Sequence, residues 1–535
     1  MLLAGPFGLL VVVLGAAVVV YRLIIHPAFF SPLSKIPAVH PTARFSSLWM
    51  NLQRYHHNEL NTLYHAHQRS GPVVLVGPSD ISINCVNGGL KTVYLGGFGK
   101  PDWFANIFAN FGMLNMVSME DHHSHSVRKR IVSHLYSKSN ILSSPALKGV
   151  MQEVLHNRLI PALSSVAETS TNVDVYSLFG GATMDIVTGY LYGLSASTNF
   201  TANEAERRRF HDLYFSRRGP DFWLQFPNTV SFLRKYLNIK LLPDWFASAN
   251  QKVEAFILSM ADKASTLLAN EAPTSPSHHP TVFAPLSAAL HASSAAAAPA
   301  RLATASELMD HTIAGYETST VALTYLSWRL SRDPSLQRRL RAELRAATHP
   351  SSPLPAPRAL DALPLLHALV CETLRLHTGA PGPQPRVTPP GGTALGAPGT
   401  PHRYAGVPGG VRVAASAWCL HRNEDVFPEA WAWRPERWLD GEGALLGVGR
   451  AEGPEGEKGG DERAREMGRW FWAFGSGGRV CVGSHLALYQ IKHVIAALYA
   501  NFETEVVDDE GIEQEDHFLA HPKGHRLILG LKSVP

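Results

Sequence analysis

The residues best suited to chemistry surround Cys481, near the C-terminal end of the 535-residue chain. Residues 474–483 read FGSGGRVCVG and lead directly into a helix-forming segment. The N–H groups of a glycine-rich bend and of a helix N-terminus stabilise a thiolate relative to a thiol, and a thiolate readily ligates a metal ion. The glycines let the backbone pass close to a flat group, Phe474 can shield the sulfur, and Arg479 can meet an anion. A haem, which is planar, iron-centred and carries two propionates, fits this set of residues.

Two other interpretations of Cys481 stay open at this level. A lone cysteine is often only a small buried hydrophobic residue, although that does not account for the surrounding glycines and arginine. A thiol nucleophile with a histidine base is the other, but no signature of such a protease accompanies it. The four cysteines of the chain are too few and too scattered for a disulfide framework or a four-thiolate metal cluster.

A second motif, AGYET at residues 314–318, lies inside a long helical pattern that we expect to begin at Ser306. Glycine costs about 1 kcal/mol relative to alanine in a helix, so Gly315 needs a compensating reason, such as a ligand that approaches the helix. Thr318 can donate a hydrogen bond to the carbonyl of residue 314 and locally open the helix. The alternative is a threonine satisfied by its own helix beside a solvent-facing Glu317.

The first motif matches in full the haem-binding signature of the cytochrome P-450 family, with Phe474, Gly477, Arg479, Cys481 and Gly483 at the signature positions. The sequence resembles this family over nearly all of its length. The resemblance implies a mainly α fold with a small β portion, and a haem b whose iron takes Cys481 as its axial ligand. It also implies monooxygenase chemistry.

The resemblance also assigns roles outside the cysteine loop. Glu317 and Thr318 look like the acid–alcohol pair that relays protons during oxygen activation, with Glu317 connected to solvent water. Glu372 and Arg375 lie three residues apart on a helical stretch, a spacing that brings side chains together. In this family such a pair binds an arginine from a later segment, here Arg437 of PERW, and the role is structural.

Haem propionates need cations, and the resemblance places candidates in three separate parts of the chain. They are Arg479, Arg386, and the cluster around His125, Lys129 and Arg130. The family commonly has arginine four residues after the Trp or His of this cluster, whereas here Lys129 replaces the forked guanidinium with a point charge. Arg128 or Arg130 could substitute for it. A solvated basic helix face is the alternative for the whole cluster.

Residues 2–21 carry no charge and are long enough for a helix to cross about 30 Å of hydrocarbon. No basic residue precedes this stretch and several follow it, which favours an uncleaved anchor over a signal peptide and a cytosolic domain. We therefore expect a membrane anchor at 1–26, an extended proline-rich linker at 27–45 and a cytochrome P-450 catalytic domain at 46–535. The expected location is the endoplasmic reticulum membrane, crossed once, with the catalytic domain facing the cytosol.

The remaining elements follow from composition and pattern. With 45% hydrophobic residues and a net charge of +4, the chain is globular and has no electrostatic signature of a nucleic-acid partner. Residues 72–86 predict two short strands joined by a turn at Gly77-Pro78, while 122–194 and 303–347 are helical. Residues 272–305 and 441–465 can bury little apolar surface, so we expect surface loops there.

Monooxygenase chemistry needs electrons delivered one at a time, and we find no dinucleotide- or flavin-binding segment in the chain. The expected partner is a membrane-anchored NADPH-dependent flavoprotein reductase. The expected reaction is hydroxylation of a lipophilic small molecule, such as a terpenoid or polyketide of fungal secondary metabolism. Alternatives are a fatty-acid or xenobiotic hydroxylase, a haem-dependent isomerase or dehydratase that uses no reductase, and a haem-based binding protein.

Overall fold

Helices make up most of the computed structural model, which describes residues 6–534 except 219, 271–274, 294–295, 351–352 and 447–461. Long segments repeat apolar residues at helical spacing, which explains this content. The helices are α1 Pro6–Val20, α2 Leu48–Tyr55, α3 Glu59–Ser70, α4 Trp103–Phe108, α5 His122–Val132, α6 Lys138–Ser143, α7 Pro145–Met151, α8 Ile160–Glu168, α9 Val175–Tyr192, α10 Glu204–Phe215, α11 Pro227–Leu237, α12 Asp244–Ala269, α13 Phe283–Ser293, α14 Ala297–Ser331, α15 Pro334–Ala347, α16 Pro357–Ala362, α17 Pro364–Leu376, α18 Ala417–Leu420, α19 Glu462–Trp470 and α20 Ser484–Asn501.

The strands form three small sheets with the orders β1-β2-β7-β4, β3-β9-β8 and β5-β6. Their bounds are β1 Val73–Gly77, β2 Asp80–Ile83, β3 Asn172–Asp174, β4 Pro383–Val387, β5 Thr393–Leu395, β6 Tyr404–Val407, β7 Arg412–Ser416, β8 Phe502–Asp508 and β9 Ile528–Ser533. The predicted pair of strands at 72–86 is present as the antiparallel hairpin β1–β2. The antiparallel pairing of β4 with β7 sets Arg386 opposite Val413.

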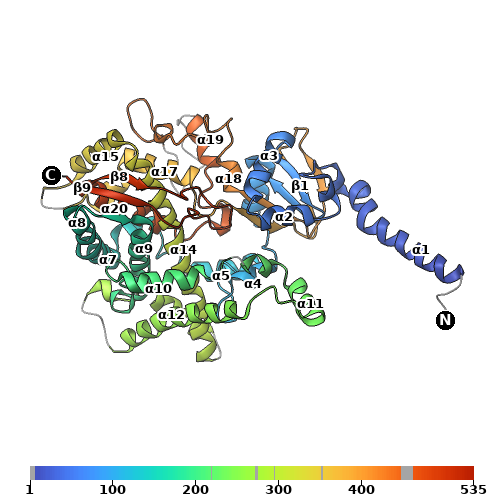
Figure 1. Ribbon diagram of the computed structural model, residues 1–535, viewed down its shortest axis with the longest axis horizontal. Helices are drawn as coiled ribbons and strands as arrows, with labels where there is room; N and C mark the ends of the chain where they lie inside the picture. Colours follow the sequence, from blue (N-terminus) through green and yellow to red (C-terminus); the bar gives the residue numbers. More distant parts are fainter. Residues whose placement is uncertain are drawn as a thin grey trace.

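The main core lies around α14, which passes through the middle of the body (Figure 1). Helix α9 is buried along almost its whole length and packs on α14, and α20 packs there as well. A side chain at Gly315 would stand 2.9 Å from Val187 of α9. The close approach of α9 to α14 therefore gives Gly315 a packing reason, and Gly315 also lines the cavity described below.

The chain is mainly helical with small sheets, as the sequence predicts, but two boundaries differ. Helix α14 begins at Ala297 and not at Ser306, and α13 lies inside the segment 272–305 that we expected to be a surface loop. Alanine favours helix even where little apolar surface is available. In α13, Phe283, Leu286 and Leu290 are nevertheless buried in the main core. Most of the predicted loop 441–465 lies outside the described residues.

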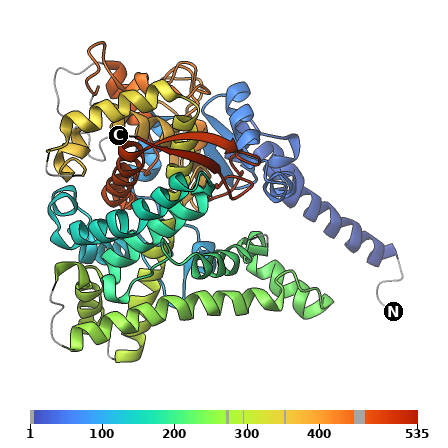
Figure 2. The same ribbon diagram turned by 60° about the vertical axis from the view of Figure 1, so that its left-hand side comes forward.

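The N-terminal helix points away from the body in both views (Figure 1, Figure 2). The stretch Leu9–Phe30 is long and apolar enough to cross a membrane, and it includes a π-helical segment that runs through Pro27. Two 3-10 turns follow, Pro32–Lys35 and Pro41–Arg44, each with proline in its first turn, where proline is well tolerated. The expectation of an extended linker at 27–45 is therefore wrong.

Candidate active site

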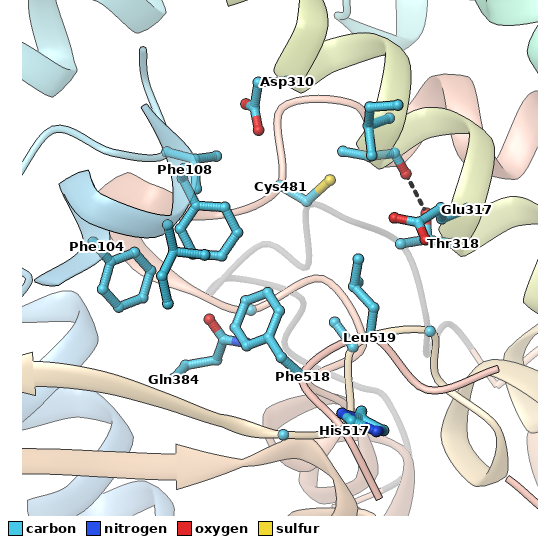
Figure 3. A pocket seen from close by; sticks show the side chains of 18 of the residues that line it. Phe104, Phe108, Asp310, Glu317, Thr318, Gln384, Cys481, His517, Phe518 and Leu519 are labelled. Carbon is cyan, nitrogen blue, oxygen red and sulfur yellow. Dashed lines mark hydrogen bonds between the residues drawn. The ribbon is translucent and has the colours of Figure 1, made fainter. Parts of the chain in front are cut away.

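A cavity of about 1180 Å³ lies between α14, the cysteine loop, α4, strand β4 and the loop that joins β8 to β9 (Figure 3). Single ligands usually occupy about 300–1,000 Å³, so this cavity has room for a flat cofactor together with a substrate. Cys481, Glu317 and Thr318 all line it, although more than 150 residues separate Cys481 from the other two. The fold thus brings both sequence motifs to one space.

The cysteine loop is a tight bend immediately before α20. The N–H of Cys481 donates to the carbonyl of Phe474 at 2.9 Å, which closes the bend. Gly475 and Gly477 have φ of +72° and +71°, a conformation that side chains with a Cβ rarely adopt. A Cβ at Gly477 would also collide with the backbone carbonyl of Tyr94. The sulfur is left facing the cavity.

The loop does not by itself ionise this cysteine. Burial raises the pKa of the Cys481 thiol above its ordinary value, and this outweighs the N–H of Gly483 and the charge of Lys129, which both lower it. The N–H of Gly483 thus favours the thiolate, as the sequence predicts, but burial opposes it. Coordination to a metal ion would remove the proton outright.

Four of the five propionate candidates line the cavity: His125, Lys129, Arg386 and Arg479. Lys129 donates to two carbonyls of the cysteine loop, those of Gly478 at 3.0 Å and Val480 at 2.9 Å, so it holds the loop.

The other two basic residues of the α5 cluster lie elsewhere. Arg130 is exposed and is not among the residues that line the cavity. Arg128 is committed to an ion pair with the buried Glu307 at 2.9 Å. Helix geometry explains the difference, because residues one apart point in different directions. The structure thus gives no support to Arg130 or Arg128 as a contact for an anion in this cavity.

Sequence reasoning missed two further donors at the same wall, Lys100 and Trp103, because neither belongs to a recognisable motif. Within the described residues, three buried nitrogens there have no hydrogen-bond partner: Nε1 of Trp103, Nδ1 of His125 and Nε of Arg479. Burial, together with the charges of Arg386 and Arg479, holds the pKa of Lys100 well below its usual value. Such a group of unpaired donors and mutually repelling cations fits an anionic ligand, and haem with its propionates is one.

At the other wall, Thr318 donates to the carbonyl of Ala314 at 2.8 Å, as the sequence predicts, and α14 remains helical through this point. Glu317 is 1% exposed. The carboxylate of Glu317 is therefore not solvent-facing, which was the alternative interpretation of this residue. The reason is that α10 and the loop after β8 cover this side of α14 with polar side chains.

Those side chains bind Glu317 tightly. Tyr214 donates to one carboxylate oxygen at 2.8 Å, while Nε2 of His521 lies 3.1 Å from the other and Arg218 3.5 Å from it. Burial acts to raise the pKa of Glu317, but His521, Arg218 and Tyr214 outweigh it and hold the pKa below its ordinary value. Arg218 also forms an ion pair with Glu515 at 2.7 Å, and Glu515 lies nearer the surface.

Behind the cysteine loop lies a buried ion cluster. Glu372 accepts from Arg375 at 2.8 Å and 2.9 Å, and from Arg437 at 3.0 Å. The carbonyl of Arg375 lies 2.8 Å from Nδ1 of His421, and Nε2 of the same ring accepts from the N–H of Trp472 at 2.8 Å. His421 therefore connects the ion cluster to the start of the cysteine loop, a link that no sequence motif marked.

The floor of the cavity is aromatic. Phe104, Phe108 and Phe518 form a row of tilted rings, with centroids 5.3 Å apart between Phe104 and Phe108 and 5.5 Å apart between Phe108 and Phe518. Figure 3 shows Phe518 and Leu519 on the loop between β8 and β9, facing α4 across the cavity. Sequence analysis did not find this loop because its apolar residues have no periodic pattern.

Comparison with known proteins agrees with this geometry. The family model for cytochrome P-450 matches residues 39–529. The cytochrome P-450 monooxygenase avaI of Aspergillus versicolor is 29% identical over 433 residues, which cover 79% of this chain and 92% of the relative. The monooxygenases hkm5 of Aspergillus hancockii and mfmF of Annulohypoxylon moriforme are each 26% identical, covering 97% and 96% of this chain and 93% and 98% of the relative, respectively. The chain therefore belongs to the cytochrome P-450 family, whose members hold haem iron, and is a cytochrome P-450 monooxygenase.

Proposed function

We propose that this protein inserts one oxygen atom from dioxygen into a C–H bond of a lipophilic small molecule. The observation that carries the proposal is the shared cavity: a cysteine with cationic side chains at one wall, an acid–alcohol pair at another and an aromatic floor. Each part matches one requirement of the reaction, namely a cofactor ligand, a proton source and a site for an apolar substrate.

Cys481 would ligate the iron of haem b, and Arg386 and Arg479, assisted by His125 and Lys100, would hold its propionates. Lys129 would act indirectly, because its ammonium fixes the carbonyls of the loop that carries Cys481. When bound, a thiolate-ligated haem supplies the electron donation that favours O–O cleavage. Phe474 and the glycines at 477 and 483 would shape the loop around the sulfur.

Thr318 and Glu317 would deliver protons to the reacting group in the cavity. The hydroxyl of Thr318 donates to Ala314 in this structure and can turn from that carbonyl to a reacting group in the cavity. Glu317 is ionised and lies next to His521 and Arg218, which lead toward the surface. We propose that protons reach Thr318 through this polar group and not by direct contact of Glu317 with water.

Electrons would come from NADPH through a separate, membrane-anchored flavoprotein reductase. The substrate class is the least constrained part of the proposal. The aromatic floor suits a terpenoid or polyketide skeleton, and it would also accept a fatty acid or an aromatic xenobiotic.

Turnover requirements test this function directly. We expect product only when NADPH, a flavoprotein reductase and dioxygen are all present. Isotopically labelled dioxygen should leave one labelled atom in the product. Product formation from an oxygenated substrate without reductase would instead identify an isomerase or dehydratase.

We also propose that the protein is held in the endoplasmic reticulum membrane with its catalytic domain in the cytosol. The apolar helix at Leu9–Phe30 supports an anchor, and exposed apolar residues of α11 and its surroundings, including Phe232, Tyr236 and Ile239, offer a second contact with lipid. Removal of the residues before Pro27 should release the protein without loss of haem. If the truncated protein stays on membranes, the surface at α11 suffices for binding.

A further inference from the structure

One carboxylate in the cavity has no partner among the described residues. Six acidic residues line the cavity, and five of them are bonded within the protein. Those five are Glu59 to Arg54, Asp80 to Arg54 and Arg412, Glu254 to the N–H of Phe111, Glu317 to Tyr214, and Asp516 to the N–H of Leu60. The sixth, Asp310, makes no hydrogen bond or ion pair with any residue that the structure describes.

The position of Asp310 suits contact with a ligand. It lies on α14 two helical turns before Thr318, and Figure 3 shows its carboxylate pointing into the space above the aromatic side chains. Burial raises the pKa of Asp310 to about 7, with His311 and Lys100 opposing that shift and Glu307 adding to it. An ionised carboxylate without a partner in such surroundings raises the free energy of the folded protein, and a cationic ligand that paired with it would offset that penalty.

The cofactor does not supply the missing partner. Haem brings two negative propionates, which Asp310 would repel and which the cationic side chains of Arg386, Arg479 and Lys100 in the same cavity would attract. His311 and, more weakly, Lys100 lower the pKa of Asp310, but neither forms an ion pair with it among the described residues, and the ammonium of Lys100 donates to the carbonyl of Val117. The pKa of Lys100 is lowered by the charges of Arg386 and Arg479 more strongly than it is raised by the charge of Asp310. Once the charges of the cofactor are assigned, Asp310 is still unpaired.

We propose that the substrate is a lipophilic molecule that carries one positively charged nitrogen, and that Asp310 binds this nitrogen while the apolar part lies against the aromatic floor. This inference rests on the proposed monooxygenase function and narrows its substrate class. The aromatic row supports it, because the faces of phenylalanine rings attract cations. The ammonium of Lys100 already lies 4.6 Å from the centroid of the Phe104 ring.

A matched pair of probes isolates the charge. Benzyltrimethylammonium and neopentylbenzene have the same shape, and the quaternary nitrogen can neither titrate nor ligate iron. Binding to the full-length holoprotein is measured by titration calorimetry at about pH 8, where Asp310 is ionised. We expect wild type to bind the cation at least about tenfold more tightly than the neutral probe, and Asp310→Asn to abolish that preference.

Glu254→Gln is the control, because it removes the same charge from the same cavity at a carboxylate that already has a partner. It should leave most of the preference for the cation intact. Equal binding of the two probes by wild type would overturn the proposal, as would an equal loss for both probes in Asp310→Asn. The thiolate-type spectrum of the reduced, carbon-monoxide-bound protein is recorded in parallel. Its absence would count against the monooxygenase function, whereas calorimetry reports on Asp310 independently.

Discussion

Two charged clusters flank the cysteine loop and differ in how their polar atoms are satisfied. In the ion cluster behind the loop, both oxygens of Glu372 accept hydrogen bonds from arginine side chains, and Nε1 of Trp438 adds another at 2.9 Å. In the cationic wall of the cavity, Nε of Arg479 and Nδ1 of His125 have no partner among the described residues. Within the part of the chain that the structure describes, Arg386 donates only to the carbonyl of its own neighbour, Pro385.

This difference distinguishes residues that stabilise the fold from residues that bind a ligand. A buried charge whose bonds are complete contributes to one arrangement of the chain, and loss of one partner leaves an uncompensated charge. A buried cation that has no anion among the described residues, such as Arg386, costs free energy in the free protein, and a bound anion would offset that cost. The first cluster should therefore control stability, and the second should control cofactor retention.

The largest effect is expected from Glu372→Gln. The substitution leaves Arg375 and Arg437 buried without their common anion, so the free energy of unfolding should fall by about 3–5 kcal/mol. Denaturant unfolding monitored by circular dichroism measures this change.

The matched control is Asp262→Asn, which breaks an ion pair with Arg301 whose side chains are 48% and 49% exposed. Exposed pairs contribute about 0–1 kcal/mol, so this variant should unfold almost like wild type. Equal effects of the two substitutions would remove the distinction between the clusters.

Arg386→Met should reduce haem retention and leave the stability of the cofactor-free protein unharmed, which is the opposite of the effect expected for Glu372→Gln. The side chain lies in the cationic wall, and burial lowers the pKa of its guanidinium. The variant should bind less haem per chain, while the cofactor-free protein should be as stable as wild type or more stable. Haem content by pyridine haemochrome and unfolding of the cofactor-free protein together measure this. A large loss of stability without a loss of haem would place Arg386 with the fold-holding cluster.

Thr318→Ala removes one hydrogen bond within a helix and should lower the free energy of unfolding by about 1 kcal/mol, much less than Glu372→Gln. Its main effect should be on coupling. Without the hydroxyl, NADPH consumption should continue while hydrogen peroxide rises and product falls. The ratio of product to NADPH consumed measures this, and an unchanged ratio would show that the hydroxyl only satisfies Ala314.

Much of this arrangement could be predicted from local sequence. Glycines at fixed spacing before Cys481 predict a bend, and the structure uses Gly475 and Gly477 in the left-handed region. Hydrogen bonding of Thr318 to its own helix is likewise a local property. The helices α9 and α20 are recognisable because apolar residues recur along them at helical spacing.

Contacts between distant segments could not be predicted. The partners of Glu317 come from α10 and from the loop after β8, and no pattern along the chain indicates that they converge. For the same reason Lys100 and His421 were missed, and the basic cluster of α5 could not be divided into cavity-facing and exposed members. Alanine-rich α13 was predicted as a loop, because composition does not show what a helix packs against.

The central claim is that Cys481 ligates haem iron, and the carbon-monoxide difference spectrum of the reduced protein tests it most directly. Wild type should show the Soret band at the position specific to a thiolate ligand. Cys481→Ser should lose that band, while Cys85→Ser, at a cysteine outside the cavity, should keep it. Retention of the thiolate-specific band in Cys481→Ser would contradict the account.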